Sequence, residues 1–463
     1  MNLGMRFRRA DAHDKSSARC WHAIETTPLS EVRRIQEEKL IAQMAYLQAN
    51  SEFYQKKLGA AGARFDDVRT IDDLQKLPYT FKAEIRDSLA ARKPFGLPLA
   101  AKPEDIIQMQ ASSGTTGSPS YVALTESDAA MWHEMSARCF FATGVRPGDM
   151  VLHAFSLAKG FVGGIPVMQG LQYLGAIDIP IGADGGADRL IRACADIRPR
   201  CVVGAPNFVL HLGEKAPEIL GIPASQLGVE RVIVGGEPGG GIPTVRRRIE
   251  ELWGAKCTEL LGGTDLGVTY WAECDEQSGM HMVSMDYIIT ELLDPETGKI
   301  IPFQDGARGE MVYTAIGRQA SPLLRFRSGD YIDVLATSCS CGRTGPKIRC
   351  IGRADDMLIV RGANVFPSAI HSIINEMMPE TNGVVRVVAD FEGHTTQSAL
   401  KIIVERGPHR PPNRDDELRN KIETRLRDAL VFKADVRIVK PDTFEKPGAA
   451  KVALTLRKYP DLS

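Results

Sequence analysis

Short apolar segments alternate with amphipathic ones between residues 146 and 270, and this pattern constrains the fold more than any other feature. Segments with helical spacing, such as 187–197 and 243–254, follow the apolar runs. This order is typical of parallel strands joined by crossover helices, so it predicts an α/β domain. The apolar runs are "DMVLHAF" (149–155), "GAIDIPI" (175–181), "PRCVVGA" (199–205) and "VERVIVGG" (229–236).

The pattern changes on either side of this region. Residues 30–58 have helical spacing, whereas about 283–350 is a series of strands and turns, which predicts a β-rich subdomain. Strand, helix and strand patterns then recur to the C-terminus. We therefore expect a large N-terminal domain over 1–354, with mixed sheets and flanking helices. A small mobile α+β domain would occupy 355–463, hinged near Asp355.

The charge and composition of the chain limit the classes of partner that it is expected to bind. The chain has 463 residues with a formal net charge of -1, which gives no bulk electrostatic reason to bind nucleic acid or an anionic membrane. It contains no run of 18 apolar residues, so no membrane span is expected. The N-terminal segment is basic but lacks the apolar core of a secretion signal, so we expect a cytoplasmic protein.

The segment "SSGTTG", residues 112–117, combines glycines with closely spaced hydroxyls. Glycines let backbone N–H groups turn toward an anion, and the hydroxyls add donors without bulk. The segment therefore predicts a polyphosphate site, although a Ser/Thr-rich surface turn has the same composition. It lacks the spacing and the lysine of the usual P-loop.

Two further segments supply partners for a nucleotide. Asp330 in "SPLLRFRSGD" follows an apolar and basic strand, where a carboxylate is suited to vicinal ribose hydroxyls. Arg353 in "GRADDMLIVRGANVFP" offers a fork-shaped phosphate partner at the expected domain boundary. Taken singly, Asp330 is better explained as a turn aspartate, and a linker with solvated charges is the alternative for Arg353.

Taken together, these segments carry a family resemblance. From about residue 30 to 455 the sequence resembles the adenylate-forming enzymes, and within them the phenylacetate-CoA ligase group. The entry region, "SEFYQKKLGAAG" and "LPYTFKAEIRD", is similar to that group as well. The motifs, in the family's order, are "SSGTTG", "GGEP" (235–238), "GGTDLG" (262–267), "SPLLRFRSGD", "GRADDMLIVRGANVFP" and "AAKVAL" (449–454).

The resemblance implies a two-step ligase that uses ATP, Mg²⁺ and coenzyme A. A carboxylate would attack the α-phosphate of ATP to form an acyl-adenylate, and the CoA thiol would then take the acyl group. Thr264 would contact the α-phosphate and Asp265 would lie near the magnesium ion. Asp330 would bind the ribose, and Arg353 the ribose or phosphates. The other implied nucleotide-binding residues are Ser112, Ser113, Gly114, Thr115, Thr116 and Gly117 at the β/γ-phosphates, with Gly236, Glu237, Pro238 and Gly263 around the adenine and α-phosphate.

The same resemblance implies a catalytic lysine on the small domain. Lys451 in "GAAKVAL" is the best match and Lys446 is the competitor, while Asp355 would be the hinge between the two steps. Ser118 replaces a loop lysine of the family, and Leu261 replaces an aromatic residue that stacks on adenine. Both departures are expected to weaken ATP binding.

The acyl pocket implied by the resemblance follows the third strand. Phe155 and Phe161 would form an apolar wall, and an aryl or arylacetic acid is the expected substrate. Lys159 would meet a polar substituent, or else point to water. The glycines that would leave room for a flat ring are Gly235, Gly236 and Gly262.

Three of the nine cysteines and one histidine suggest a metal site. Cys274 and His281 lie seven positions apart, and Cys339 and Cys341 lie two apart on a predicted turn. Three thiolates and one imidazole complete a tetrahedral site, so we predict structural Zn²⁺, with Cys350 as a substitute ligand. Reduced thiols in a β-rich region are the alternative.

Two other functions stay open. The acyl group could pass to an amine or to a carrier-protein thiol, because an acceptor site between domains lies on variable loops. Alternatively, the chain could bind an acyl-nucleotide with weak or no turnover, in keeping with Ser118 and Leu261. A homodimer is compatible with every one of these functions.

Overall fold

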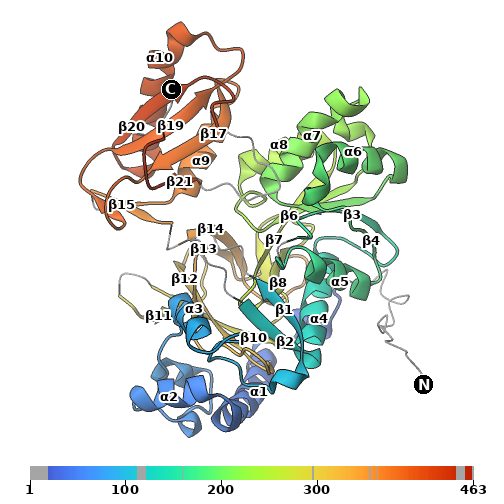
Figure 1. Cartoon of the computed structure of the whole chain (residues 1–463), viewed down its shortest axis with the longest axis vertical. Coiled ribbons are helices and arrows are strands. Elements are labelled where there is room, and N and C mark those ends of the chain that lie inside the picture. The colour runs from blue at the N-terminus through green and yellow to red at the C-terminus, as the bar shows by residue number, and fades with distance from the viewer. Residues whose placement is uncertain are drawn as a thin grey trace.

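The computed structural model of the chain describes residues 19–111, 121–158, 160–294, 297–353, 356–361, 363–444 and 454–460. A large N-terminal domain carries a smaller C-terminal domain at one end (Figure 1). In the described part of the chain, no helix is long and apolar enough to cross a membrane.

A mixed sheet, with twelve strands among the described residues, forms the centre of the large domain. The predicted apolar runs form β3 to β6, and they pair in parallel. The strands of the parallel half, in spatial order, are β4 (Ile177–Ile179), β3 (Met150–Ala154), β5 (Cys201–Gly204), β6 (Arg231–Gly235) and β7 (Lys256–Gly263). The predicted α/β fold class is confirmed.

The β-rich region does not form a sheet of its own, because its strands continue the same sheet. The direction reverses at the hairpin between β7 and β8, and every later pairing is antiparallel. The antiparallel half contains β8 (Gly267–Glu273), β9 (Met280–Met282), β14 (Lys347–Arg353), β13 (Phe326–Ala336), β12 (Arg308–Ala315), β10 (Ile288–Leu293) and β11 (Ile300–Ile301).

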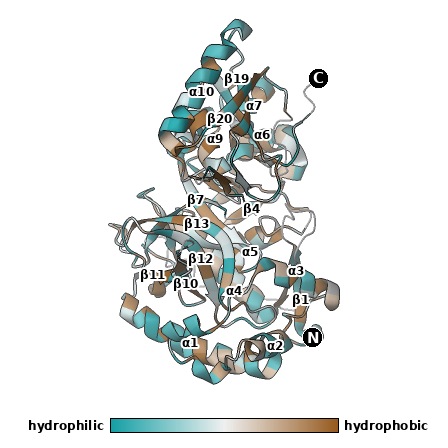
Figure 2. Cartoon of the chain, turned by 90° about the vertical axis from the view of Figure 1, so that its left-hand side faces the viewer, coloured by the Kyte–Doolittle hydropathy of each residue, from teal (hydrophilic) through white to brown (hydrophobic). Residues whose placement is uncertain are grey.

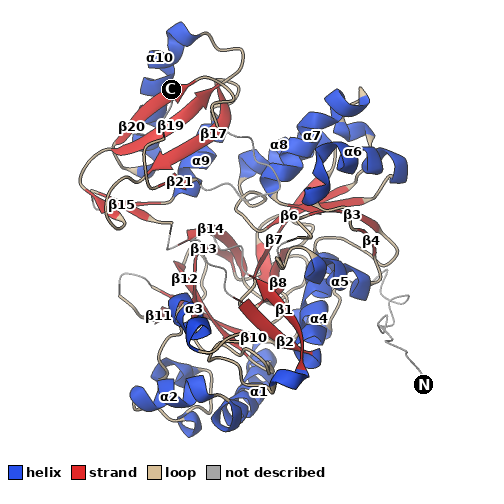
Figure 3. Ribbon diagram, in the orientation of Figure 1, coloured by secondary structure: helices blue, strands red, loops and turns tan. Residues whose placement is uncertain are grey.

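Helices cover both faces of the parallel half (Figure 3). Val151 and Val203 pack toward α4 (Glu126–Ala142) and α5 (Ile165–Leu174), whereas Leu152 and Val202 pack on the opposite face. That alternation follows from the two-residue period of a strand. The helices of the opposite face are α6 (Gly186–Ile197), α7 (Pro206–Leu220) and α8 (Pro243–Trp253).

The N-terminal helices and a hairpin complete the large domain. The helical region expected over 30–58 consists of two helices that meet at Ser51, whose hydroxyl accepts a hydrogen bond from Tyr54 N and caps the second helix. The elements are α1 (Leu29–Asn50), α2 (Glu52–Ala60), α3 (Lys82–Ala91), β1 (Ile106–Ala111) and β2 (Tyr121–Thr125). The hairpin strands β1 and β2 pair antiparallel and flank the segment 112–120.

The small domain packs helices α9 and α10 on a sheet ordered β20-β19-β17-β21. Its core is aliphatic, while the outer face of α10 is hydrophilic (Figure 2). The elements are β15 (Leu358–Val360), β16 (Ala363–Val365), α9 (Pro367–Glu376), β17 (Thr381–Val388), β18 (Thr395–Thr396), β19 (Leu400–Arg406), α10 (Asp415–Leu430), β20 (Ala434–Val439) and β21 (Thr455–Leu456). The expected hinge, Asp355, lies outside the described residues, between β14 and β15.

Candidate active site

The loops that follow the parallel strands meet at one edge of the sheet. Because the strands are parallel, the segments after β3, β5, β6 and β7 emerge on the same side. Two contacts tie neighbouring loops together. Asn207 N, after β5, donates to Glu237 Oε1, after β6, at 3.2 Å. A Cβ on Gly236 would lie 3.8 Å from the Phe155 ring, after β3. The segments that follow β3, β5 and β6 are thus brought to one place.

The glycine-rich segment after β6 is held by a buried carboxylate on β7. Glu259 is 6% exposed, and its Oε1 accepts a hydrogen bond from Gly239 N at 3.3 Å. A Cβ on Gly241 would lie 2.6 Å from Glu259 Oε2, so the close approach requires glycine there. Burial, reinforced by the negative charge of Glu273, raises the pKa of Glu259 to about 7. The loop that carries Glu237 and Pro238 therefore rests on Glu259.

Asp330 and Arg353 face each other across β13 and β14. They are partners in the strand register, and Arg353 Nη1 donates to Asp330 Oδ1 at 2.9 Å. Arg353 Nη2 also donates to Ser328 O at 3.1 Å. Two residues singled out for the same nucleotide are therefore in direct contact.

A buried tyrosine connects Asp330 to the turn between β7 and β8. Burial raises the pKa of Tyr270, and the negative charges of Asp330 and Asp265 add to this shift. A Cβ on Gly263 would lie 3.4 Å from the Tyr270 hydroxyl. The Tyr270 side chain thus lies between the strand that carries Asp330 and the turn that carries Asp265.

The turn itself presents Thr264 and Asp265, which are 6% and 8% exposed. Arg318, buried against Trp132, donates from Nη1 to the Asp265 carbonyl oxygen at 2.6 Å and fixes the backbone of the turn. Asp265 Oδ2 accepts a hydrogen bond from Lys82 Nζ at 3.0 Å. Asp265 Oδ1 is buried and has no hydrogen-bond partner among the described residues. A buried carboxylate oxygen of this kind suits Mg²⁺, which prefers oxygen ligands.

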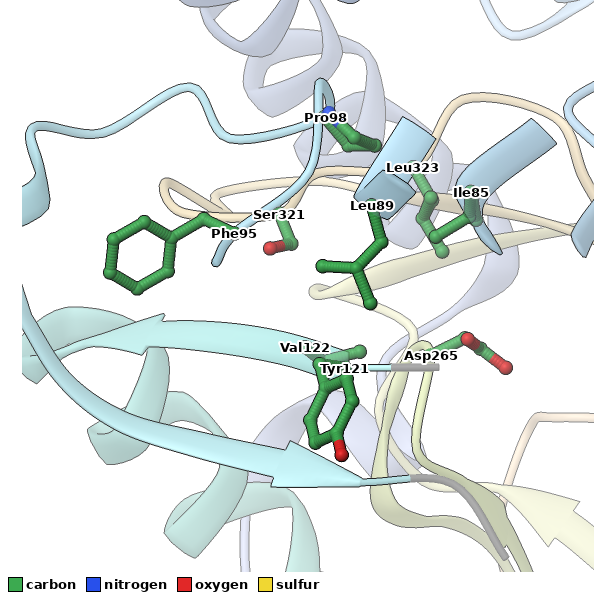
Figure 4. A pocket seen from close by; sticks show the side chains of 9 residues that line it. All are labelled: Ile85, Leu89, Phe95, Pro98, Tyr121, Val122, Asp265, Ser321 and Leu323. Atoms are coloured by element: carbon green, nitrogen blue, oxygen red, sulfur yellow. The ribbon is translucent and has the colours of Figure 1, made fainter. Parts of the chain in front are cut away.

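A small cavity of about 20 Å³ opens beside Asp265. In Figure 4 the Asp265 carboxylate lies near apolar side chains from α3 and β2, among them Leu89 and Val122. The volume has room for about one water-sized group. The apolar walls lower the local dielectric around Asp265 and strengthen its attraction for a cation.

The two phenylalanines after β3 lie together. The ring centroids of Phe155 and Phe161 are 6.4 Å apart, edge to face, and Phe155 is 8% exposed. Of the three glycines expected to leave room for a ring, Gly236 faces Phe155. By contrast, a Cβ on Gly262 would lie 1.8 Å from Val268 O, and one on Gly235 would lie 2.9 Å from Leu260 O. Close strand packing therefore accounts for Gly235 and Gly262.

The four expected metal ligands form one group, away from this edge. Cys274 follows β8, His281 lies on β9, and Cys339 and Cys341 lie between β13 and β14; their ligand atoms are all within 4.8 Å of one another. Cys274 Sγ lies 3.8 Å from His281 Nε2 and 3.9 Å from Cys339 Sγ. Zn–S bonds of about 2.3 Å separate tetrahedral ligand atoms by roughly 3.8 Å, so the group fits zinc.

The protonation of the histidine and cysteines in this group also suits metal binding. His281 Nδ1 lies 2.9 Å from Gly345 O and must donate to it, which leaves the Nε2 lone pair toward the thiols. A hydrogen bond from the Cys274 thiol lowers the pKa of Cys341. A cysteine that ionises readily beside an available imidazole nitrogen is suited to bind a cation.

Several predicted residues lie outside the described part of the chain. They are Ser112, Ser113, Gly114, Thr115, Thr116, Gly117, Ser118, Lys159, Asp355, Lys446 and Lys451. Their described neighbours are nonetheless informative: Ala111 N, at the end of β1, donates to Gly160 O at 2.9 Å. The chain therefore enters the segment 112–120 directly beside the two phenylalanines.

Sequence reasoning missed Lys82 and Glu259. Lys82 stands in "LPYTFKAEIRD", which the family resemblance includes, but its partner Asp265 is 183 positions away. Glu259 lies in a largely buried strand, "KCTELLGG", where a single buried carboxylate is the available signal.

Comparison with known sequences matches both domains of the chain to one family of enzymes. The profile of the AMP-binding enzyme family matches residues 23–317, and that of the AMP-binding enzyme C-terminal domain matches residues 362–453. A phenylacetate-coenzyme A ligase from Thermus thermophilus is 33% identical over 384 residues, which cover 82% of this chain and 83% of the relative.

Solved structures of 2-hydroxyisobutyryl-CoA ligase are similar over nearly the whole chain. Its postadenylation state, in complex with R3-HIB-AMP, has a TM-score of 0.87 at 27% identity and covers 96% of this chain and 93% of its own. Its thioesterification state, with 2-HIB-AMP and CoA, has a TM-score of 0.70 at 28% identity, covering 95% and 93%. Since both are states of one ligase, the domains of this chain are arranged more like the postadenylation state.

Proposed function

The chain belongs to the AMP-binding enzyme family, and on this basis we propose that its acid is a small aromatic carboxylic acid of the phenylacetate type. The enzyme is an AMP-forming acid–thiol ligase, which activates an acid with ATP through an acyl-adenylate and transfers it to coenzyme A. The observation that carries the aromatic proposal is the edge-to-face pair of Phe155 and Phe161, with Phe155 beside Gly236. An aryl group of the acid could make ring–ring contacts of the same kind with these side chains.

In the first step a carboxylate oxygen bonds to the α-phosphorus of ATP, and the bond to the bridging oxygen breaks to release pyrophosphate. Two anions must approach, so positive charge is needed at the phosphates. Thr264 donates its hydroxyl to the α-phosphate. Lys82 orients the Asp265 carboxylate through their ion pair, and Asp265 Oδ1 would hold Mg²⁺. When bound, Mg²⁺ neutralises charge on the triphosphate.

The nucleoside is held by residues of three elements. Asp330 accepts hydrogen bonds from the ribose hydroxyls while Arg353 fixes its orientation. Glu237 and Pro238, on the loop supported by Glu259, line the adenine. The segment 112–117 binds the β/γ-phosphates, and Lys451 approaches the α-phosphate from the small domain; these two roles rest on the family resemblance.

In the second step the sulfur of coenzyme A bonds to the acyl carbon, and the bond to the AMP oxygen breaks. The thiol loses its proton and AMP leaves with the electron pair. Asp355 is the proposed hinge for the domain movement between the steps. The two states of 2-hydroxyisobutyryl-CoA ligase support such a movement in a relative.

We also propose that Cys274, His281, Cys339 and Cys341 bind a structural zinc ion. Four protein ligands close the coordination shell, so the metal joins the turn after β8 to the loop between β13 and β14 and does not activate water.

The proposed acid is tested by measuring kcat/KM for acyl-CoA formation over a panel of carboxylic acids. The panel contains phenylacetate, benzoate, 2-hydroxyisobutyrate and hexanoate, with ATP, Mg²⁺ and CoA held constant. We expect the highest kcat/KM for phenylacetate or another arylacetic acid. Activity confined to the aliphatic acids would refute the aromatic proposal and leave the ligase reaction standing.

A further inference from the structure

The segment 155–164, between β3 and α5, carries both phenylalanines of the proposed acyl site and has two anchors. Asp184 holds its first half, accepting hydrogen bonds from Ser156 Oγ at 2.9 Å and from Leu157 N at 2.8 Å. The second anchor lies inside the core: His153 Nε2 is 2.8 Å from Gly163 O. The first half of the segment is therefore tied to the turn that precedes α6, and its far end is tied to β3 of the parallel sheet.

His153 is an unusual residue for its position. It is wholly buried on β3, a strand of the parallel sheet where aliphatic residues are the rule. Its Nδ1 lies 3.1 Å from Oδ1 of Asp178 on β4, and the Asp178 side chain is 1% exposed. A buried polar pair without a packing reason is the informative exception in a core.

The hydrogen-bond partners determine which ring nitrogen carries a proton. Gly163 O only accepts, so Nε2 must donate to it. Nδ1 then shares a proton with the Asp178 carboxyl group, in either direction. Asp178 therefore keeps the ring oriented so that Nε2 meets Gly163, as a carboxylate orients a histidine in other sites.

Gly163 in turn supports the Phe161 ring. A Cβ on Gly163 would lie 2.3 Å from Phe161 Cε1, so the ring lies directly on this glycine. Phe161 pairs with Ala111, the last residue of β1, in an isolated bridge. A shift of Gly163 would consequently displace both the ring and the bridge between Phe161 and Ala111.

From this chain of contacts we infer that His153, oriented by Asp178, is a positioning residue that places the Phe161 ring and thereby sets which acids are accepted. The inference rests on the proposed function, because it requires Phe161 to contact the acyl group. It goes beyond that function by naming buried residues that never touch the substrate.

Two substitutions of His153 distinguish the loss of its hydrogen bond to Gly163 O from a loss of core packing. Glutamine carries its amide nitrogen near the place of Nε2, so His153→Gln keeps a donor for Gly163 O. Asparagine carries its nitrogen near Nδ1, so His153→Asn keeps the contact with Asp178 and loses the one to Gly163. His133→Gln, at a partly buried histidine of α4, is the matched control. For each protein, KM for the acid, KM for ATP and the thermal midpoint are measured.

For His153→Asn we expect KM for the acid to rise by about 10-fold, the effect of losing one buried hydrogen bond, while KM for ATP changes by less than about 2-fold. His153→Gln should recover most of the acid affinity, and the control should match wild type. Equal KM for the acid in the Asn and Gln variants would overturn the inference, as would parallel increases for acid and ATP. The comparison uses whichever panel acid the wild type activates best, so a wrong acid class refutes the proposed function alone.

Discussion

Removing the positive charge of Lys82 should impair ATP use more than acid use. The Lys82 ammonium lies 3.0 Å from Asp265 Oδ2, with the two side chains 37% and 10% exposed. A hydrogen bond between charged groups contributes about 1.5–3 kcal/mol. Because more than a third of the lysine is exposed, solvent screening reduces this to about 1–2 kcal/mol. Lys82→Met should therefore lower kcat/KM for ATP by about 5- to 30-fold.

The assay is steady-state pyrophosphate release with ATP as the varied substrate and the acid at saturation. Lys76→Met is the matched control, because Lys76 makes a 2.7 Å ion pair with Asp73 on the surface, with its side chain 57% exposed. We expect the control to behave as wild type. A double variant with Asp265→Asn should lose no more activity than Asp265→Asn alone, since Lys82 acts through that carboxylate.

Either of two results would refute this reasoning. One is a kcat/KM for ATP within about 2-fold of wild type in Lys82→Met, which would mean that the ion pair is a surface contact of little consequence. The other is additive losses in the double variant, which would show that the two residues act independently.

Three further predictions concern the metal, pH and packing. Purified protein should contain about one zinc per chain, and Cys341→Ser should lose it and lower the thermal midpoint; full stability without metal would contradict the site. Burial raises the pKa of Glu259 from 4.5 to about 7, so between these pH values the folded chain binds one proton more than the unfolded chain. The free energy of unfolding should therefore fall by up to about 3 kcal/mol as the pH rises from 4.5 to 7. Denaturant titrations at pH 5 and pH 8 give the free energy of unfolding at each pH, and the difference between the two values should be smaller in Glu259→Gln than in wild type. An equal difference in both proteins would contradict the raised pKa of Glu259. Gly262→Ala should abolish folding or lower the free energy of unfolding by more than about 3 kcal/mol, because the added Cβ would lie 1.8 Å from Val268 O. A thermal midpoint equal to that of wild type would show instead that the β7–β8 hairpin can shift to make room for the added carbon.

Local patterns predicted the parallel half of the sheet because each strand is a short apolar run bounded by turn residues. They do not show where a single side chain divides an element: residues 30–58 have helical spacing, and the Ser51 hydroxyl caps a second helix within that range. They also do not show that the strands of the β-rich region extend the parallel sheet, through the pairing of β9 with both β8 and β14.

In the candidate site, too, local sequence patterns do not show which side chains contact one another. Asp330 and Arg353 could be singled out from their motifs, but their mutual contact depends on the register of β13 and β14. The contacts between Lys82 and Asp265, and between His153 and Gly163, are set by tertiary packing that no local period encodes. The residues proposed to touch a ligand stand in recognisable motifs, whereas the residues that contact and orient them do not.

Acid-dependent exchange of labelled pyrophosphate into ATP, without coenzyme A, tests the central claim most directly because it reports only the formation of the acyl-adenylate. We predict exchange with an arylacetic acid and Mg²⁺, and its loss in Lys451→Ala and in Asp330→Ala. Acyl-CoA should then appear only when coenzyme A is added. An absence of exchange with every acid of the panel, in folded protein that still binds ATP, would contradict the account.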